Sequence, residues 1–565
     1  MIEQLSAGHA AHGACNRRLA VAAVAIATLL GSTRMAAGQA CIADCDRDGR
    51  VTVAELITGV NVLLGSAELA QCPRADCNHR GDVSVNCLVQ GVNAAVAGCL
   101  GVASPAVEGP VTGGSGAPFV ASTNFDFADV GYVQSEWFLS GTARSFRNDH
   151  ALGEDGKWAV RDGDRASYKT RVIVDRPIDP SDFNGTVYVE WLNVSGGLDA
   201  GPDFANAHTE IIREGAAWVG LSAQKVGVEG GTAAVGVIDL PLKKIDPVRY
   251  ASLSHPGDSF SYDIFSQAGQ AIRDRAGIAP LDELNVQRII ALGESQSAFR
   301  FVTYINAIHR SARVYDGYLV HSRGGIGVPL SEAPQDDIPV PSTAPVRDDL
   351  DVPTLIFETE TDLTFLNYLA ARQPDSERVR TWEVAGTSHV DTYTVVNGPG
   401  DTGNSIEFAK LLITKDPVPG LLTCSEPINS GPQHFVLNAA VAALERWVRD
   451  GTPPPVSPRL EVDAGPPPAI VRDARGIALG GIRTPAVDVP LAVLSGDPQM
   501  GSLFCSLFGT TTPFDAATLT TLYGDTATYA AAVAASTAAA VDAGFILPPD
   551  AALIDGAAED TPIGQ

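Results

Sequence analysis

The stretch "IIALGESQSAFRFV", residues 289–302, decides the expected fold of this chain. An apolar run ends at Gly293, and small residues then surround Ser295. Apolar side chains follow at helical spacing, at Phe299, Val302, Ile305 and Ile308. The stretch therefore predicts a buried strand, a tight turn that carries Ser295, and a helix.

This arrangement fits the Gly-x-Ser-x-Gly nucleophile elbow of α/β-hydrolases, in which a strained strand-to-helix turn exposes a serine hydroxyl. Here the last position is Ser297, which is also small, so the turn remains sterically allowed. The motif alone is expected about once by chance in a chain with 56 glycines, so the strand–turn–helix context carries the prediction. The helix N-terminus adds positive potential near the hydroxyl. We expect Ser295 to be a nucleophile.

A serine nucleophile needs a base, and in this fold the acid and then the histidine follow the serine along the chain. His389 lies in "WEVAGTSHVD", just after the last predicted strand, where the base belongs. His309 lies on the helix that leaves the turn, His321 lies inside a strand, and His434 begins a later helix. We expect His389 to be the base and the other three to be structural.

The acid of such a triad follows the penultimate strand. "VPTLIFETETDLTF" ends that strand with two candidates, Glu360 and Asp362. Asp362 stands nine residues after Pro353, a common spacing for this acid, and is favoured. Either carboxylate would orient the histidine and stabilise its imidazolium form.

Two backbone N–H groups are expected to bind the oxyanion. One belongs to Gln296, the residue after the nucleophile, and the other comes from the loop after an early strand. "EWLNVSGG", residues 190–197, occupies that place, so Asn193 or Val194 is the candidate. The two glycines of this loop are equally explained by a simple turn.

From about residue 120, apolar β-rich runs alternate with helical segments. Continuous apolar strands indicate burial on both faces, which is typical of a parallel sheet flanked by helices. The expected strands are 185–194, 216–224, 288–293, 316–322, 352–359 and 380–386, and clear helical segments are 205–215 and 261–277. The fold class is therefore α/β, with a mostly parallel sheet.

A separate motif precedes this domain. "DCDRDGRVTVAE", residues 44–55, matches a calcium loop of the type D-x-D-x-D-G with a closing acid at its twelfth position. The candidate ligands are Asp44, Asp46, Asp48, the carbonyl of Arg50, Thr52 and Glu55. Hard oxygen donors in this pattern favour Ca²⁺ as a structural ion.

The motif repeats 32 residues later, where Arg80 and Cys87 replace ligand positions, so we expect about one bound calcium. Each loop leads into an amphipathic helix. Residues 41–101 resemble a dockerin or a paired EF-hand, and this resemblance implies a cohesin-like protein partner. Dockerins usually keep both loops in working order.

The N-terminus predicts export. Arg17 and Arg18 precede a short apolar run and small residues, which indicates a signal peptide over residues 1–40. Eight cysteines then remain, an even number that predicts disulfides in an exported chain. Six cluster in the front module, where the pairing is open, and Cys424 with Cys505 is the remaining pair. The expected location is secreted or periplasmic, in a bacterium.

Composition excludes some partners. The formal net charge is −27, and phosphate binding needs clustered Lys and Arg, so we expect no nucleic acid partner. No stretch outside the signal is long and apolar enough for a membrane helix.

A second resemblance, to a different family, rests on longer motifs and covers most of the chain. From about residue 105 to the end, the sequence looks like a group of secreted bacterial alpha/beta-hydrolase-domain proteins. The motifs are "VYVEWLNVSGG", "RYASLSHPGDSFSYDIFSQAG", "GESQSAFR", "VYDGYLVHSRGG", "FETETDL" and "WEVAGTSHVD". The resemblance implies the hydrolase fold and a triad of Ser295, His389 and an acid.

The expected organisation has four parts. They are a signal peptide (1–40), a small disulfide-rich EF-hand/dockerin-like α module (41–101), a linker or extended lead-in (102–119) and an alpha/beta-hydrolase domain (120–565), with 455–565 as a C-terminal elaboration.

The expected function is that of a serine hydrolase that needs no catalytic cofactor and cleaves a small-molecule or polymer-borne carboxylic ester through an acyl-enzyme. Two alternatives remain. One is a peptidase or acyltransferase that uses the same triad. The other is a catalytically inactive, calcium-binding adhesion or scaffold protein, because a fold does not guarantee a function.

Overall fold

The computed structural model describes residues 42–46, 51–77, 81–97, 102–114, 116–236, 238–274, 281 and 284–564. The expected signal peptide, Cys41 and Cys99, and the candidate calcium ligands Asp48 and Arg50 lie outside the described residues.

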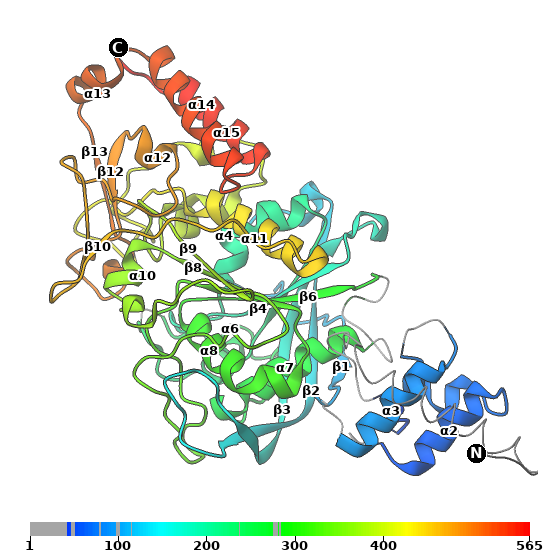
Figure 1. The fold of residues 1–565 in the computed structure, drawn as a ribbon. Helices are drawn as coiled ribbons and strands as arrows, with labels where there is room; N and C mark the ends of the chain where they lie inside the picture. The colour runs from blue at the N-terminus through cyan, green and yellow to red at the C-terminus, as the bar shows by residue number, and fades with distance from the viewer. Residues whose placement is uncertain are drawn as a thin grey trace, which may run out of the picture.

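A nine-stranded sheet forms the centre of the described chain, in the order β1-β2-β3-β5-β4-β6-β7-β8-β9 (Figure 1). Strands β4 to β9 pair in parallel, whereas β1, β2 and β3 pair antiparallel, and β3 also pairs antiparallel with β5. The strands are β1 (Ala106–Glu108), β2 (Tyr132–Asn148), β3 (Val160–Pro177), β4 (Thr186–Trp191), β5 (Ala217–Leu221), β6 (Arg288–Glu294), β7 (Gly317–His321), β8 (Thr354–Glu358) and β9 (Val379–Glu383). The predicted α/β class is confirmed, and all six expected strands are present.

The long β2–β3 hairpin was not predicted. The first half of β3 is mostly exposed and only its second half is buried. Exposed, charged strand residues carry little of the apolar signal on which strand prediction depends. The hairpin extends the parallel sheet at one edge, and β1 adds the outermost strand within the segment expected to be a linker or lead-in.

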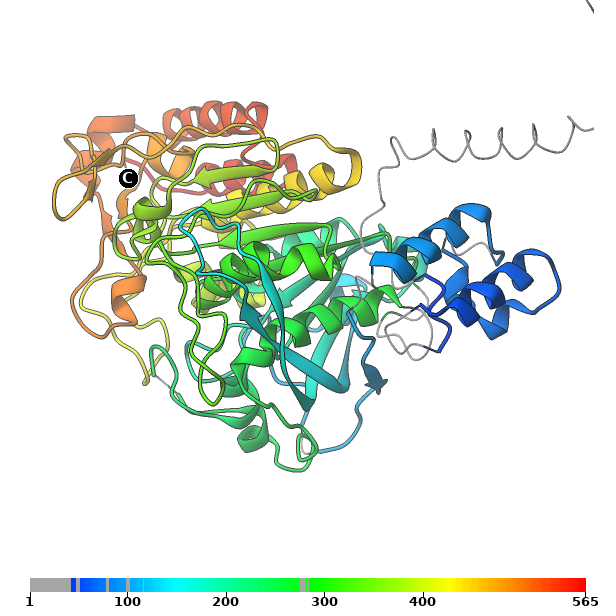
Figure 2. The same cartoon turned by 60° about the horizontal axis from the view of Figure 1, so that its bottom comes forward.

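Helices cover both faces of the sheet, as Figure 2 shows, with α11 and the C-terminal helices on one side and α7 and α8 on the other. The helices of this domain are α4 (Pro202–Arg213), α5 (Lys225–Glu229), α6 (Leu242–Ile245), α7 (Ser261–Arg273), α8 (Gln296–Thr303), α9 (His309–Ala312), α10 (Glu360–Thr364), α11 (Gln433–Asp450), α12 (Pro485–Asp488), α13 (Ala516–Tyr523), α14 (Thr526–Asp542) and α15 (Pro548–Glu559).

Alternation along the strands explains the two hydrophobic layers. Successive strand side chains point to opposite faces of a sheet. On β6, Ile289 and Ala291 join the apolar cluster that includes α7 and α8, whereas Ile290 and Leu292 join the cluster that includes α4 and α11. Burial on both faces is the reason why β6 reads as a continuous apolar run.

The C-terminal segment packs outside α11. Asn438 of α11 donates a hydrogen bond to Asp550 of α15 at 3.0 Å, and two small hairpins lie nearby. The hairpins are β10 (Val462–Asp463) with β11 (Ala469–Ile470), and β12 (Ala492–Ser495) with β13 (Thr510–Pro513). The predicted disulfide between Cys424 and Cys505 is present.

The front module contains α2 (Val53–Leu63) and α3 (Val85–Ala97), and lies beside the domain that holds the nine-stranded sheet (Figure 1). Disulfides link Cys45 with Cys72 and Cys77 with Cys87. Arg74 forms an ion pair with Asp274, the residue after α7, at 2.8 Å between Nη2 and Oδ2, and so joins the two parts. Within the described ranges, every helix is too short or too polar to cross a bilayer.

Candidate active site

Ser295 occupies a strained turn between β6 and α8. Its backbone angles are φ 56° and ψ −122°, a left-handed φ that non-glycine residues rarely adopt. A Cβ atom on Gly293 would lie 2.9 Å from the Phe301 ring and 3.2 Å from the backbone of Ser297. Because the chain doubles back so closely, the motif needs small residues, and Ser297 fits there with its side chain fully buried.

His389 lies between Ser295 and Asp362. Its Nε2 atom is 2.7 Å from Oγ of Ser295, and its Nδ1 atom is 2.6 Å from Oδ1 of Asp362. Ser295 follows β6, Asp362 lies in α10 after β8, and His389 follows β9. Parallel strands end at one edge of the sheet, so three segments far apart in sequence meet there.

The carboxylate of Asp362 is held from its other side. Its Oδ2 atom accepts hydrogen bonds from the Thr359 N–H at 2.7 Å, the Thr359 hydroxyl at 2.6 Å and the Ser322 hydroxyl at 2.7 Å. These three donors orient Oδ1 towards His389.

Glu360, the other candidate acid, lies in the same short helix as Asp362, but its carboxylate forms hydrogen bonds and an ion pair with residues other than His389. Its carboxylate accepts from the N–H groups of Gly386 at 2.6 Å and Gly496 at 3.0 Å, and pairs with Arg472 at 2.8 Å. The geometry therefore brings His389 together with Asp362 and gives Glu360 a bracing position between the sheet and the C-terminal segment.

The candidate oxyanion donors lie at the ends of neighbouring strands, since β4 pairs with β6. Gln296 is the first residue of α8, so its N–H has no acceptor within the helix. The N–H of Asn193 donates to the Ala200 carbonyl at 2.8 Å, whereas that of Val194 has no acceptor within the described chain. Of the two candidates, Val194 thus has the available donor.

With this geometry established, comparison with known families decides the class of protein. The sequence model described as "Alpha/beta hydrolase domain" matches residues 107–555, more than half of the chain. The chain belongs to this family.

The solved structures to which the chain is similar are distant in sequence. A fungal esterase from Rhizomucor miehei is 11% identical, with 55% of this chain and 84% of that chain covered and a TM-score of 0.25. A serine hydrolase without a lid from Xanthomonas campestris is 12% identical (44% and 85% covered, TM-score 0.25). A putative dienelactone hydrolase from Klebsiella pneumoniae is 13% identical (44% and 85% covered, TM-score 0.24). No curated protein matches the chain.

Glu294 is an acidic residue of the hydrolase site that sequence reasoning missed. Its Oε1 atom lies 3.3 Å from Nε2 of His389, and its Oε2 atom accepts from the side-chain amide of Asn193 at 3.2 Å. Burial raises the pKa of Glu294 to about 7. Its position directly before the serine, at the end of a buried strand, was the available signal.

The carboxylates of Asp362 and Glu294 change the pKa of His389. Burial alone lowers the pKa of its imidazole, but the negative charges of Asp362 and Glu294 outweigh that effect and raise the pKa above the ordinary value. A histidine held in this way is a stronger base than a free one, and its positive form is stabilised where a proton would arrive.

The three other candidate histidines contact buried groups of the protein. His309 bonds to the Tyr318 hydroxyl at 2.7 Å, and His321 to Asp203 at 2.8 Å. His434 stacks on a tyrosine ring. Burial lowers the pKa of His321 to about 4, so this side chain is neutral near pH 7.

The front module holds a candidate metal centre. Ligand atoms of Asp44, Asp46 and Glu55 lie within 4.8 Å of one another. Glu55 also accepts from the N–H groups of Thr52 and Cys45, each at 2.7 Å, which fixes its carboxylate at the start of α2. This all-oxygen donor set suits a hard cation.

Proposed function

We propose that this protein is a serine hydrolase that cleaves carboxylic esters. The observation that carries the proposal is the continuous hydrogen-bonded chain from Ser295 through His389 to Asp362, at 2.7 and 2.6 Å. This arrangement matches the relation of nucleophile, base and orienting acid that activates a serine hydroxyl. Membership of the alpha/beta hydrolase family supports it.

In the proposed reaction, Oγ of Ser295 attacks the ester carbonyl carbon while Nε2 of His389 takes the hydroxyl proton. Asp362 stabilises the resulting imidazolium, and the N–H groups of Gln296 and Val194 bind the oxyanion. The C–O bond to the alcohol then breaks, and the alcohol leaves with the proton from His389. A water molecule, deprotonated by His389, then attacks the acyl-enzyme. The bond between the acyl carbon and Oγ of Ser295 breaks, His389 returns the proton to Oγ, and the acid is released.

A fluorophosphonate probe and a panel of p-nitrophenyl esters test the proposal. The native protein should be labelled and should hydrolyse at least one ester, and Ser295→Ala should lose both properties. Ser297→Ala is the matched control, because it removes a second hydroxyl two residues away and should remain labelled. An unlabelled native protein beside a labelled esterase control would refute the proposal and favour the inactive scaffold.

The same triad serves peptidases and acyltransferases, so the panel includes a matched amide and a competing alcohol acceptor. Faster cleavage of the amide, or transfer to the alcohol in preference to water, would replace ester hydrolysis as the assignment.

For the front module, we propose one structural Ca²⁺ at the oxygen cluster around Glu55, with Asp48, Arg50 and Thr52 as further ligands from the loop. An ion there would bridge the carboxylates of Asp44, Asp46 and Glu55, of which Asp44 also pairs with Arg74 at 3.2 Å. Calorimetric titration should give one site, and Asp46→Asn should weaken it. Two tight sites, or none, would contradict this assignment.

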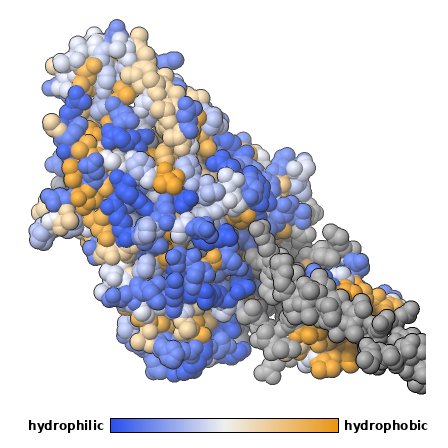
Figure 3. Space-filling model, in the orientation of Figure 1, coloured by the Kyte–Doolittle hydropathy of each residue, from blue (hydrophilic) through white to orange (hydrophobic). Residues whose placement is uncertain are grey.

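We also propose that this module docks a cohesin-like protein partner. An apolar stripe at helical spacing runs along both of its helices, and exposed apolar patches mark interaction sites. The stripe consists of Val53, Ile57 and Val60 on α2, Leu64 directly after α2, and Val85, Val89 and Val92 on α3. Figure 3 shows apolar surface on this module.

A binding assay with a cohesin domain tests the docking proposal. Ile57→Asp combined with Val89→Asp should abolish binding, whereas Val456→Asp, at an even more exposed apolar site on the hydrolase domain, should not. No binding by the native chain, or equal loss in both variants, would oppose it.

Export from a bacterial cell to the periplasm or the medium is proposed on the N-terminal sequence and on the disulfides, which persist in oxidising compartments. N-terminal sequencing of the protein after export should begin near residue 41. A mature chain that retains Met1 would contradict cleavage.

A further inference from the structure

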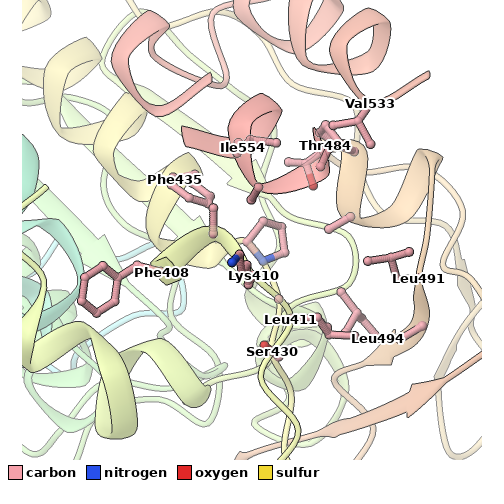
Figure 4. Close-up of a pocket in the computed structure, with 18 of the residues that line it drawn as sticks. Phe408, Lys410, Leu411, Ser430, Phe435, Thr484, Leu491, Leu494, Val533 and Ile554 are labelled. Atoms are coloured by element: carbon pink, nitrogen blue, oxygen red, sulfur yellow. The ribbon is translucent and has the colours of Figure 1, made fainter. Parts of the chain in front are cut away.

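A cavity lies between α11 and the C-terminal helices. Its volume is about 110 Å³, and its walls come from α11, α12, β12, α14, α15 and the segment 392–411 (Figure 4). None of Ser295, His389 and Asp362 lines it. The cavity is therefore distinct from the proposed catalytic site, and no step of ester hydrolysis uses it.

Most of the lining is apolar. Figure 4 shows side chains from α11, the segment around β12, α14 and α15 facing the cavity: Phe435, Leu491, Leu494, Val533 and Ile554. An apolar protein cavity of about 150 Å³ accommodates benzene. The space here is about three-quarters of that size, so one six-membered ring, with its hydroxyl directed at the polar part of the wall, is the upper limit of what it holds.

Two buried polar side chains in the wall have no partner. His434 is 4% exposed, and neither of its ring nitrogens has a hydrogen-bond partner within the described chain. The hydroxyl of Thr484, which is fully buried, also has none there. Since the large majority of buried polar atoms in native proteins are hydrogen-bonded, these atoms call for a hydrogen-bond partner that the described chain does not supply.

The imidazole is held in a fixed orientation. The ring of His434 stacks on that of Tyr393 with a centroid separation of 3.6 Å and an interplanar angle of 2°. The Tyr393 hydroxyl is in turn anchored to Asp401 at 2.8 Å. A preoriented ring binds a polar group without first losing rotational freedom.

The charge state of the wall selects a neutral ligand. Burial lowers the pKa of His434 to about 3, so near pH 7 its ring is neutral and carries one N–H donor and one acceptor nitrogen. Lys410 also lines the cavity, but its ammonium group pairs with Glu407 at 2.7 Å and with Asp560. An anion would therefore find no uncompensated positive charge, whereas a hydroxyl can both donate and accept.

We propose that this cavity is a binding site for a small neutral alcohol or phenol. The hydroxyl of the ligand pairs with His434 and Thr484, and its hydrocarbon body contacts the apolar wall. The proposal stands independently of the hydrolase assignment, because it rests on side chains outside the triad.

Saturation-transfer NMR and calorimetry with phenol on the full chain test the site at pH 7.5, with benzene and benzoate as comparison ligands. Phenol should bind, and benzoate should bind at least about tenfold more weakly, as expected for an uncompensated charge. His434→Phe keeps the ring stack and removes both nitrogens, so phenol affinity should fall about tenfold, the value of roughly one hydrogen bond, while benzene still binds.

A second variant separates loss of the site from loss of the fold. Val533→Phe should fill the cavity and abolish binding of both phenol and benzene, whereas Val456→Phe on the exposed surface should not. The thermal midpoint of His434→Phe should equal or exceed that of the native chain, because two unpaired buried atoms are removed. No phenol binding by the native protein, which would leave water as the only occupant, overturns the proposal. Benzoate binding as tight as that of phenol, or phenol binding unchanged in both cavity variants, overturns it as well.

Discussion

Replacing Asp362 with asparagine should put His389 into the wrong tautomer. The Oδ2 position of Asp362 faces three donors, of which the Thr359 N–H can only donate. The asparagine carbonyl must therefore take that position, and its NH₂ group must face Nδ1 of His389. The ring then accepts at Nδ1 and carries its proton on Nε2, so it can no longer accept the proton of Ser295.

Asp362→Asn should lower kcat greatly and change the free energy of unfolding little. In a serine protease, the equivalent change lowers kcat about 10⁴-fold while leaving the geometry intact. Four decades correspond to about 5.4 kcal/mol in the activation free energy. Because the replacement is isosteric and keeps three hydrogen bonds at the former Oδ2 position, we expect the free energy of unfolding to change by only about 1 kcal/mol.

Ester turnover and chemical denaturation, measured on the same preparations, give the two quantities. The matched control is Glu360→Gln, which alters a buried carboxylate in the same helical turn. Its loss of the Arg472 ion pair should reduce the free energy of unfolding by about 2 kcal/mol, while kcat stays within about tenfold of the native value. If Asp362→Asn retained native turnover, or if Glu360→Gln were the inactive variant, the assignment of the acid would be wrong.

Three further changes follow from the same structure. Glu294→Gln removes a negative charge beside His389, so the pKa of this base should fall and the acidic limb of kcat/KM should move to lower pH. Gly293→Ala places a methyl group 2.9 Å from an aromatic ring and should reduce both the free energy of unfolding, by about 2 kcal/mol, and probe labelling. Replacing Cys424 and Cys505 with serine opens a loop of 81 residues and should reduce the free energy of unfolding by about 4 kcal/mol without removing activity below the melting temperature.

The sign of the pH effect follows from which form of the base is active. His389 acts only when neutral, and its raised pKa means that activity falls as pH decreases through that pKa. Loss of the Glu294 charge extends activity to lower pH, so a limb that stays in place or moves upward would contradict the coupling. Full labelling of the Gly293 variant would show that the turn has more room than the structure indicates. An unchanged melting temperature in the cysteine variant would mean that the loop is held by packing instead.

The local sequence was sufficient to predict the strands that are buried on both faces, because these strands are continuous apolar runs. The strand before Ser295 is buried on both faces, so its apolar run was visible, and the same holds for the five other strands that were predicted. The β2–β3 hairpin escaped prediction, and the mostly exposed first half of β3 carries little apolar signal. The sequence also predicted that His389 follows the last strand of the main sheet, and the structure has it there. The spacing from Pro353 favoured Asp362 as the acid but left Glu360 as an alternative.

The sequence could not show which of the two neighbouring carboxylates points toward His389. Glu360 and Asp362 differ by two positions in one helical turn, and only the packed C-terminal segment shows that Glu360 faces Arg472 while Asp362 faces His389. Likewise, the N–H of Asn193 is consumed by Ala200, a contact visible only in three dimensions.

By itself, the sequence determined the α/β class, the turn at Ser295 and the order of the candidate residues, because strand burial and tight turns impose local constraints on residue type. The tertiary structure alone decided which carboxylate meets the histidine, that Glu294 joins them, and that His434 faces a cavity. Those outcomes depend on contacts between segments tens to hundreds of residues apart, and no local pattern records which side chains will share a space after folding.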